Sequence, residues 1–505
     1  MNKFICVHGH FYQPPRENPW TGEVDAEESA SPFHDWNERI AQECYRANTE
    51  AKIPEIDDQP ASHVNNFSRL SFDIGPTLLS WLRRKDPKTY MAILDADRQS
   101  LLKRNGHGNA IAQIYNHIIM PLAKTHDKMT QVVWGIRDFE FHYKRKPEGM
   151  WLSETAVDRE TLNILADHGI LYTILAPHQA SRVRHVGFGS RWRYVRHEEV
   201  DPKHVYRMVL DHGRHFHIFF YDGPVSRAIA FQGLLANGDQ FVNRLLGAFG
   251  RRDRDQLVST ATDGESFGHH HKFGEMALAY AFKKIEDQHL ARTTNFGEFL
   301  EHCGSFWEVD VYEKSSWSCA HGVERWRSDC GCRLRHEPGW NQRWRADLRE
   351  AFDFLKEIVD ETFVAHLDPL VKDPWAARND YIAVILDPSP SSRREFLFKN
   401  AKRALKAEEE KKLWDLLEAQ KFALFMYTSC GWFFDDISGI EPVQVMKFAL
   451  RSLELVQPYY QKDIESAFLK ILRNAKSNFP ELGTGEDIFN RFVKPARQNL
   501  SSRTQ

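Results

Sequence analysis

The chain has 505 residues, of which 42% are hydrophobic and 12% are aromatic, and its 67 Lys and Arg side chains nearly balance its 70 Asp and Glu side chains. This length allows two or three domains with large apolar cores. A net charge of −3 argues against a nucleic-acid-binding protein, which needs a concentrated basic surface to neutralise phosphates.

No apolar stretch of the sequence approaches the length of a membrane span, and the apolar run at residues 4–7 is too short for a signal-peptide core. We therefore expect a cytoplasmic protein with no membrane partner. The seven cysteines are an odd number in a long chain, so they do not make a disulfide framework. The sequence leaves the oligomeric state unknown.

Over the first ~300 residues, short apolar runs alternate with amphipathic stretches, a pattern typical of β/α units on a parallel sheet. Pro76 is expected to begin a helix, because proline is tolerated in a first helical turn, and Gly169 is expected to end another. The predicted strands are residues 4–8, 71–73, 150–153, 171–176, 215–221 and 257–262.

From about residue 300 the pattern becomes helical. Apolar residues between Trp344 and Phe363 recur every three or four positions, and residues 401–420 and 445–456 are further predicted helices. No strand-like alternation separates them, and the polar tail after Lys494 is expected to fray. We therefore predict an α/β domain at residues 1–300 and a helical region at residues 301–505.

Polar residues follow directly on apolar runs at several predicted strand ends, where parallel α/β folds bind their ligands. Residues 7–15 contain His8 and His10, two apart and therefore on one face of a strand. These histidines could bind a metal ion or form hydrogen bonds with a sugar hydroxyl. Alternatively, they only cap the end of the strand. Residues 108–122 contain His117, a weaker signal on its own.

Carboxylates occupy two further strand ends. Residues 148–155 place Trp151 beside Glu154, whereas Glu148 precedes the strand and is a weaker candidate. Residues 260–271 contain Asp263 and Glu265, followed by glycines and three consecutive histidines. The alternative for this last segment is a solvent-facing turn. Two carboxyl groups on different strands are what glycoside hydrolysis requires, one as an ionised nucleophile and one as a proton donor.

In this order the segments resemble conserved regions of glycoside hydrolase family 57, which includes α-amylases, 4-α-glucanotransferases and glucan-branching enzymes. Residues 8–14 resemble a His-x-His-Gln-Pro sequence with Phe11 and Tyr12 inserted, and residues 116–122 resemble the second region. Residues 151–154 resemble Trp-Leu-Pro-Glu with serine in place of proline. Residues 263–269 resemble the fourth region, and residues 315–317 a fifth.

The resemblance implies an incomplete (β/α)7 barrel followed by a helical region that helps to close the active site. It implies a retaining enzyme that acts on an α-glucan or maltooligosaccharide and needs no cofactor. Glu154 would be the nucleophile and Asp263 the general acid and base, with Glu265 as the reserve acid. The remaining residues expected to bind sugar are His8, His10, His117, Trp151, His269 and Trp317.

Two other functions fit the same segments. A zinc-dependent carbohydrate deacetylase would use Asp263, a histidine of the 269–271 run and His8 or His10, but the usual His-x3-His ligand spacing is absent from the sequence. A glucan-binding protein without catalytic activity is favoured by the serine that precedes Glu154 and by the insertion at Phe11 and Tyr12.

Cysteines gather in one further segment. Residues 319–332 contain Cys319, His321, Cys330 and Cys332, four soft ligands in a C-x-H and C-x-C pattern. They could form a tetrahedral zinc site, although the spacing is not the common C-x2-C, and a reduced, packed loop with buried thiols is the interpretation that the sequence favours. The aromatic and acidic segment 427–439 is expected to be a packed turn between helices.

Overall fold

In a computed structural model, which describes residues 2–53, 61–187, 189–251 and 254–500, the chain divides into two compact units. Unit 1 comprises Met1–Gln13, Ala26–Gln113 and Phe139–Glu313, and unit 2 comprises Pro14–Asp25, Ile114–Asp138 and Lys314–Gln505. The sequence predicted one boundary at residue 300. In the structure, unit 1 continues to Glu313, and two early segments belong to unit 2.

Unit 1 is built on seven parallel strands, which form the incomplete (β/α)7 barrel expected from the resemblance. In order around the barrel they are β12 (Gln256–Asp263), β1 (Lys3–Phe11), β4 (Ser71–Ile74), β5 (Ala112–Gln113), β6 (Met150–Trp151), β7 (Tyr172–Leu175) and β11 (His215–Phe220). Parallel bridges from Phe72 to Ala110 and from Gly149 to Tyr172 join the shorter pairs.

The barrel has one weak seam, between β11 and β12. These strands belong to different sheets, and Asp222, just after β11, donates its backbone N–H to the carbonyl of Ser259 at 2.7 Å. Beyond β11 the sheet continues through β10 (Val205–Val209), β14 (Trp307–Val311), β8 (Ala180–His185) and β9 (Arg193–Tyr194). Because β14 pairs with β8 and β10, unit 1 extends past the predicted boundary.

Strand β1 lies inside the barrel sheet, with β12 on one side and β4 on the other. All residues of this strand after Lys3 are buried, as expected for a parallel strand covered on both faces. At its end, the Phe11 ring packs so closely on Gly264 that a Cβ there would lie 2.4 Å from the ring. Glycine therefore allows the turn after β12 to approach the end of β1.

Helices surround the strands of unit 1. Pro76 begins α3 and Gly169, with φ +82°, follows the end of α6, as predicted. The helices are α1 (Trp36–Ile40), α2 (Ala47–Thr49), α3 (Pro76–Lys85), α4 (Pro87–Lys103), α6 (Arg159–Asp167), α7 (Gly223–Phe231), α8 (Gly238–Gly247), α9 (Gly274–Asp287) and α10 (Phe296–Cys303). The short strands β2 (Ala51–Ile53), β3 (Ser62–Val64) and β13 (Arg292–Thr293) complete unit 1.

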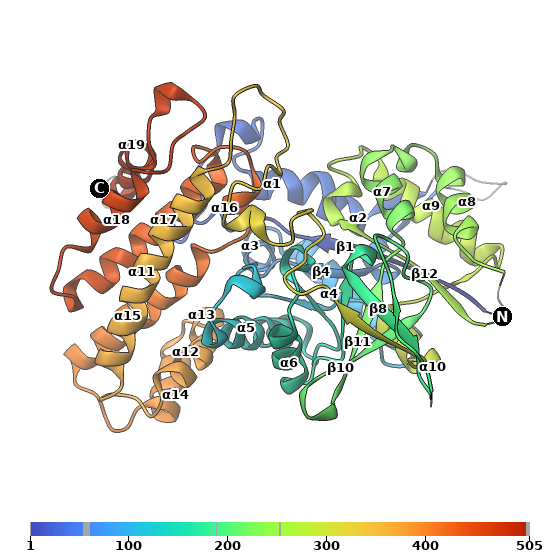
Figure 1. The fold of residues 1–505 in the computed structure, drawn as a ribbon, viewed down its shortest axis with the longest axis horizontal. Helices are drawn as coiled ribbons and strands as arrows, with labels where there is room; N and C mark the ends of the chain where they lie inside the picture. Colours follow the sequence, from blue (N-terminus) through green and yellow to red (C-terminus); the bar gives the residue numbers. More distant parts are fainter. Residues whose placement is uncertain (1, 54–60, 188, 252–253, 501–505) are drawn as a thin grey trace. The chain divides into compact units, whose positions relative to one another are not determined.

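Unit 2 is helical, as predicted for the second half of the chain (Figure 1). Its longest helix, α11 (Trp344–Leu367), packs on α15 (Ala407–Phe425) and α18 (Ile464–Leu472), and α15 packs on α17 (Ile440–Val456). The other helices are α12 (Pro374–Asp380), α13 (Ile382–Leu386), α14 (Pro390–Asn400), α16 (Cys430–Phe433) and α19 (Gly485–Ile488). Helix α5 (Thr125–Tyr143) begins in unit 2 and ends in unit 1.

The prediction of a helix at residues 401–420 is wrong for residues 401–406, which are not helical in the structure. Ala401 forms a bridge with Val371, and Lys402 donates its N–H to Leu370. Helix α15 then begins at Ala407, where the Glu409 side chain accepts the N–H of Lys406. This contact satisfies one of the free N–H groups that a helix start exposes. Among the described residues, no helix is both long enough and apolar enough to cross a membrane.

Candidate functional site

Two histidines and one aspartate form the centre of the candidate site in unit 1. The parallel register places His8 opposite Ser71 and His10 opposite Asp73. His8 Nε2 lies 3.1 Å from Asp73 Oδ1, and His10 Nδ1 lies 2.7 Å from Asp73 Oδ2. Asp73 is fully buried. The sequence indicated Asp73 only as the last residue of a predicted strand, so its role was missed, although it follows an apolar run like the other candidates.

The charges of this cluster are set by the shared carboxylate. Burial alone would raise the pKa of Asp73, but the charge and hydrogen bond of His10, together with those of His8, hold it below its ordinary value. Burial likewise opposes a raised pKa of His10, yet the charge and the hydrogen bond of Asp73 prevail. For His8, burial outweighs Asp73 and the pKa is lowered. The arrangement therefore favours an ionised Asp73, a protonated His10 and a neutral His8.

Asp263 stands at the end of β12, directly opposite His10 in the register. It is the exposed residue of an otherwise buried strand, although the protein around its carboxyl shields that group from water. This surrounding protein raises the pKa of Asp263; His10 opposes the shift and the negative charge of Asp73 adds to it. A raised pKa favours the protonated form of the carboxyl, which is the form that a general acid needs.

Glu265 has a different environment. It is buried, and its Oε1 atom accepts hydrogen bonds from the Tyr12 N–H at 3.2 Å, the Tyr45 hydroxyl at 3.1 Å and the Gln13 amide at 3.4 Å. Burial raises the pKa of Glu265 to about 8, and the charge of Asp263 adds to the shift. Glu265 therefore carries a proton at neutral pH while its other oxygen serves as an acceptor.

Trp151 and Glu154 come from β6 and the turn that follows it. The Trp151 ring stacks on His8, with centroids 5.1 Å apart, and on His10, with centroids 5.0 Å apart. Glu154 lies three residues later in the short 3-10 turn Ser153–Thr155, with φ +56°. Left-handed backbone at a residue other than glycine costs about 1–3 kcal/mol and is often found at functional sites.

Gln179 holds this strained turn in place. Its Oε1 accepts the Thr155 hydroxyl at 2.8 Å and the Ala176 N–H at 2.9 Å, and its Nε2 donates to the Thr155 carbonyl at 2.9 Å. Thr155 also has a positive φ, +50°. A fully buried amide thus compensates for the strain around Glu154. The sequence carried no signal for Gln179, which lies outside all the recognised segments.

Gln113 also lines this part of the barrel and was missed by the sequence analysis. It is the last residue of β5, in register with Trp151 of β6, and its side chain lies close to Gly75 and thus to the end of β4. It is 3% exposed, and neither its amide nitrogen nor its oxygen has a hydrogen-bond partner among the described residues. Buried polar atoms without partners are rare and often serve a ligand.

His269 contacts a separate group of residues. Its Nδ1 lies 2.5 Å from Glu43 Oε2, and its ring meets the edge of the Trp36 ring with centroids 6.0 Å apart. These partners belong to α1 and the helical segment after it, whereas His8 and His10 contact β4 and β6.

The other two predicted sugar-binding residues, His117 and Trp317, belong to unit 2. His117 is buried with φ +54°, and its Nδ1 lies 2.7 Å from the Ser429 hydroxyl. The Ser429 N–H donates to the His117 carbonyl, and Thr428 donates its hydroxyl to the Asn116 carbonyl. The aromatic and acidic segment 427–439 therefore holds His117. Trp317 is half-buried in the loop after β14.

A separate pocket in unit 2 contains none of the predicted site residues. It is lined by residues of the segment 118–127, of α11 and of the end of α15, and charged side chains such as Lys124, Asp353 and Lys356 contribute to it. We assign it no role in the candidate site.

The metal ligands that a deacetylase needs do not meet at the barrel mouth. Within the described ranges, the groups of histidine, cysteine and carboxylate side chains that approach closely enough to share a metal ion include neither His8, His10 nor Asp263. Both histidines are instead hydrogen-bonded to Asp73, which supports the glycosidase interpretation of this cluster.

The proton on Glu265 should make stability depend on pH. The unfolded chain releases this proton near the ordinary value of 4.5, whereas the folded protein keeps it until about pH 8. Folding therefore takes up a proton in this window, so stability should fall as pH rises through it, by about 3–5 kcal/mol in total.

Glu265→Gln keeps an oxygen that can accept the same three hydrogen bonds but cannot ionise. Thermal unfolding of this variant and of the wild type at about pH 5 and about pH 8 should show a smaller loss of stability in the variant. Equal losses in the two proteins would contradict the raised pKa.

Two family models match the chain. The model described as Glycosyl hydrolase family 57 matches residues 4–313, and the model described as Domain of unknown function (DUF3536) matches residues 340–503. No curated protein matches the chain.

Several solved structures share the fold. An exo-type maltose-forming amylase from Pyrococcus sp. ST04 matches with a TM-score of 0.71 and 15% identity, covering 100% of this chain and 95% of that one. A branching enzyme from Thermococcus kodakaraensis matches with a TM-score of 0.54 and 12% identity, covering 98% and 95%. A 4-α-glucanotransferase from Thermococcus litoralis matches with a TM-score of 0.53 and 15% identity, covering 92% and 60%.

At such low identity these structures establish the fold alone. The family model, however, matches more than half of the chain. It includes every element that carries the barrel-mouth cluster, which we define as His8, His10, Asp73, Trp151, Glu154 and Asp263. The chain therefore belongs to glycosyl hydrolase family 57.

Proposed function

We propose that this protein is a retaining glycosidase or transglycosylase of α-glucans, with Glu154 as nucleophile and Asp263 as general acid and base. The observation that carries the proposal is the position of His10, which lies opposite Asp263 in the sheet and stacks on Trp151, three residues before Glu154. Two carboxyl side chains on different strands thus flank one charged histidine, and one of them has a raised pKa.

The substrate class rests on the family and on the activities named for proteins of similar fold. These are a maltose-forming amylase, a branching enzyme and a 4-α-glucanotransferase. In the proposed site, His10 and Gln113 would hydrogen-bond hydroxyls of the sugar, and the fully buried Trp151 ring would hold the His10 ring in place. His117, His269 and Trp317 remain predicted contacts with the substrate.

The proposed reaction has two steps. In the first, a Glu154 oxygen attacks the anomeric carbon, and the bond to the leaving sugar breaks as its oxygen takes the proton of Asp263. In the second, Asp263 removes a proton from water or from an acceptor hydroxyl, whose oxygen displaces Glu154 from the anomeric carbon. Water gives hydrolysis and a sugar acceptor gives transglycosylation. The raised pKa of Asp263 supports its starting state as a proton donor.

Asp263 is a better candidate for the acid than its neighbour Glu265. The three hydrogen bonds to Glu265 Oε1 and its burial tie that side chain to β1 and to Tyr45. Asp263 is exposed and can reach a glycosidic oxygen. Glu265 would then support the site as a neutral acceptor that does not add a second negative charge beside Asp73.

Replacing the nucleophile tests the first step. Glu154→Gln should lower kcat by on the order of 10⁴-fold or more, because no carboxylate is left to form the glycosyl-enzyme. Glu154→Gly should adopt the φ of +56° without strain, and added azide should restore turnover and yield a glycosyl azide of inverted anomeric configuration.

The matched control is Glu148→Gln, since Glu148 pairs with His107 at 2.8 Å and has no part in the mechanism. This variant should retain wild-type activity on maltooligosaccharides. Undiminished turnover in Glu154→Gln would remove Glu154 from the proposed mechanism.

Replacing the acid and base tests the second step. Asp263→Asn should lose about 10²–10⁴-fold in turnover of maltooligosaccharides, but a maltosyl fluoride needs no protonation of its leaving group. With this substrate the variant should release a burst of fluoride and then stall, because no base activates water, and mass spectrometry should detect a glycosyl group on Glu154. If Glu265→Gln produces the burst and Asp263→Asn does not, Glu265 and not Asp263 is the general acid and base.

Gln113 should show a trade-off between stability and activity. Gln113→Leu removes buried amide atoms without partners and should raise the free energy of unfolding by about 1–2 kcal/mol, while kcat/KM falls roughly tenfold or more as a hydrogen bond to sugar is lost. Gln179→Leu is the matched control. It removes an amide with three hydrogen bonds and should destabilise the protein. A destabilised Gln113→Leu with full activity would contradict the assignment.

A further inference from the structure

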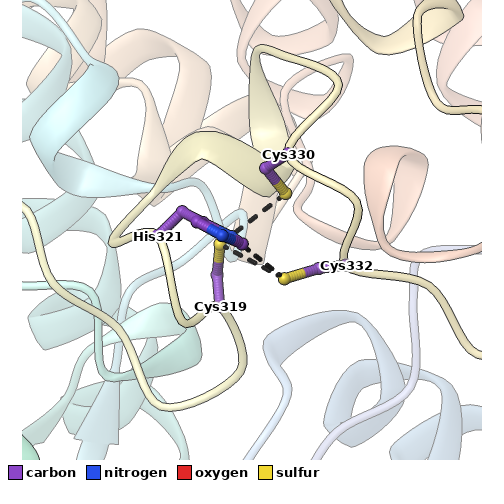
Figure 2. Close-up of side chains that lie close together, drawn as sticks. All are labelled: Cys319, His321, Cys330 and Cys332. Carbon is purple, nitrogen blue, oxygen red and sulfur yellow. Dashed lines mark hydrogen bonds between the residues drawn. The ribbon is translucent and has the colours of Figure 1, made fainter.

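Four potential metal ligands converge in unit 2, on the loop between β14 and α11. Figure 2 shows the side chains of Cys319, His321, Cys330 and Cys332 pointing toward a common centre. Their ligand atoms all lie within 4.8 Å of one another, and the three cysteines are not joined in disulfides. The family assignment and the proposed catalytic reaction give these residues no role.

The separations match the edges of a zinc tetrahedron. Zinc bonds of about 2.3 Å to sulfur and 2.0–2.1 Å to nitrogen place two sulfurs about 3.8 Å apart, and a sulfur and a nitrogen about 3.6 Å apart. Cys319 Sγ lies 3.9 Å from Cys330 Sγ and 3.8 Å from Cys332 Sγ, and Cys332 Sγ lies 3.6 Å from His321 Nδ1. A disulfide would require about 2.05 Å between sulfurs.

The loop backbone is shaped to present these ligands. Gly331, between two of the cysteines, has φ +82°, and Gly322, next to His321, has φ +84°, conformations that favour glycine. A Cβ at Gly322 would lie 2.4 Å from the Lys314 carbonyl oxygen. Backbone N–H groups of His321 and Arg325 donate to the Cys319 sulfur, the kind of contact that stabilises metal-bound thiolates.

The charge around the loop also suits a bound cation with three thiolates. Such a centre with a neutral histidine would carry a net charge of −1. Arg345 is fully buried, donates to the carbonyls of Cys332 at 2.9 Å and Phe434 at 3.0 Å, and interacts electrostatically with Cys330 and Cys332. This buried guanidinium would balance the negative centre, because a buried charge needs a partner of opposite sign.

Within the described residues, the other groups of side chains that could hold a metal ion are either paired with cationic side chains or close to the surface. Asp127 and Asp360 accept hydrogen bonds from Lys356, and Asp127 also pairs with Arg378 at 2.8 Å, so cationic side chains take the place of an ion. Asp255, in the group with His302 and Cys303, accepts the N–H of Asn2 at 2.7 Å and lies near the surface. The cysteine and histidine loop is therefore the strongest metal candidate.

We propose that Cys319, His321, Cys330 and Cys332 bind one zinc ion in tetrahedral coordination. Four protein ligands fill the coordination sphere, so this is a structural site, not a catalytic one. Zinc would close the loop 319–332 around the buried Trp326, whose Nε1 donates to the Ser429 carbonyl at 3.2 Å. Ser429 in turn contacts His117, so the metal would also support the segment that holds this histidine.

Metal content of the full-length protein tests the proposal directly. After reduction, removal of metal and reloading with zinc alone, elemental analysis should find one zinc ion per chain. Cobalt in its place should give the visible absorption bands of tetrahedral cobalt bound by thiolates. Absence of stoichiometric zinc in the reloaded, reduced protein would overturn the proposal.

Variants locate the ion. Cys330→Ser and Cys332→Ser should each weaken zinc binding at least about a hundredfold, since even changes in the surroundings of metal ligands cost 10–100-fold. His321→Cys retains four soft ligands and should keep the metal. Cys430→Ser, a half-buried cysteine of the same unit outside the cluster, is the control and should bind zinc like the wild type. Equal affinity in Cys332→Ser and Cys430→Ser would also overturn the proposal.

A measurement on the wild type avoids variants that fail to fold. Zinc should protect Cys319, Cys330 and Cys332 from alkylation, and a chelator should expose them, as mapped by mass spectrometry of peptides. The labelling of Cys430, a half-buried thiol outside the groups of described side chains that could share a metal ion, provides the internal reference. Equal labelling of the three cysteines with and without chelator would show that they hold no metal.

Discussion

The buried carboxylate of Asp73 is the constraint on which the barrel-mouth cluster depends. A charge without solvent must be paired, and Asp73 meets this need through His8 and His10 at once. The pairing favours a protonated His10 and orients both rings so that Trp151 stacks on them. The protonation states of Asp73 and His10 therefore depend on each other, whereas burial is the main cause of the shifts at His8 and Asp263.

The sequence predicted much of the barrel because its strands are short apolar runs that end in polar residues. Those predictions located His10, Trp151 and Asp263 at strand ends, and the structure places His10 beside both of the others. Asp73 and Gln179 escaped prediction for a physical reason. Periodicity shows where a strand ends but not which strand ends face each other, and both residues act through partners far away in the chain.

Periodicity does not show which distant segments pair, and this also explains where the predicted and observed structures differ outside the site. Strand β14 belongs to unit 1 because it pairs with β8, more than a hundred residues earlier in the chain. Residues 401–406 have helical composition, but bridging to the segment near Val371 prevails over that local preference. In the loop 319–332 the sequence showed the ligand types but not the distances between them. The folded backbone, with two left-handed glycines, brings the sulfurs of Cys330 and Cys332 within 3.9 Å of the Cys319 sulfur.

The position of β1 has a consequence for synthesis of the protein. This strand carries His8 and His10, yet its longest pairing is with β12, which is synthesised some 253 positions later. At translation rates of about 5–20 residues per second, its apolar edge waits tens of seconds for that partner. The pairing of β1 with β12 therefore forms late in synthesis, and until then the unpaired edge of β1 is a site at which chaperones would act.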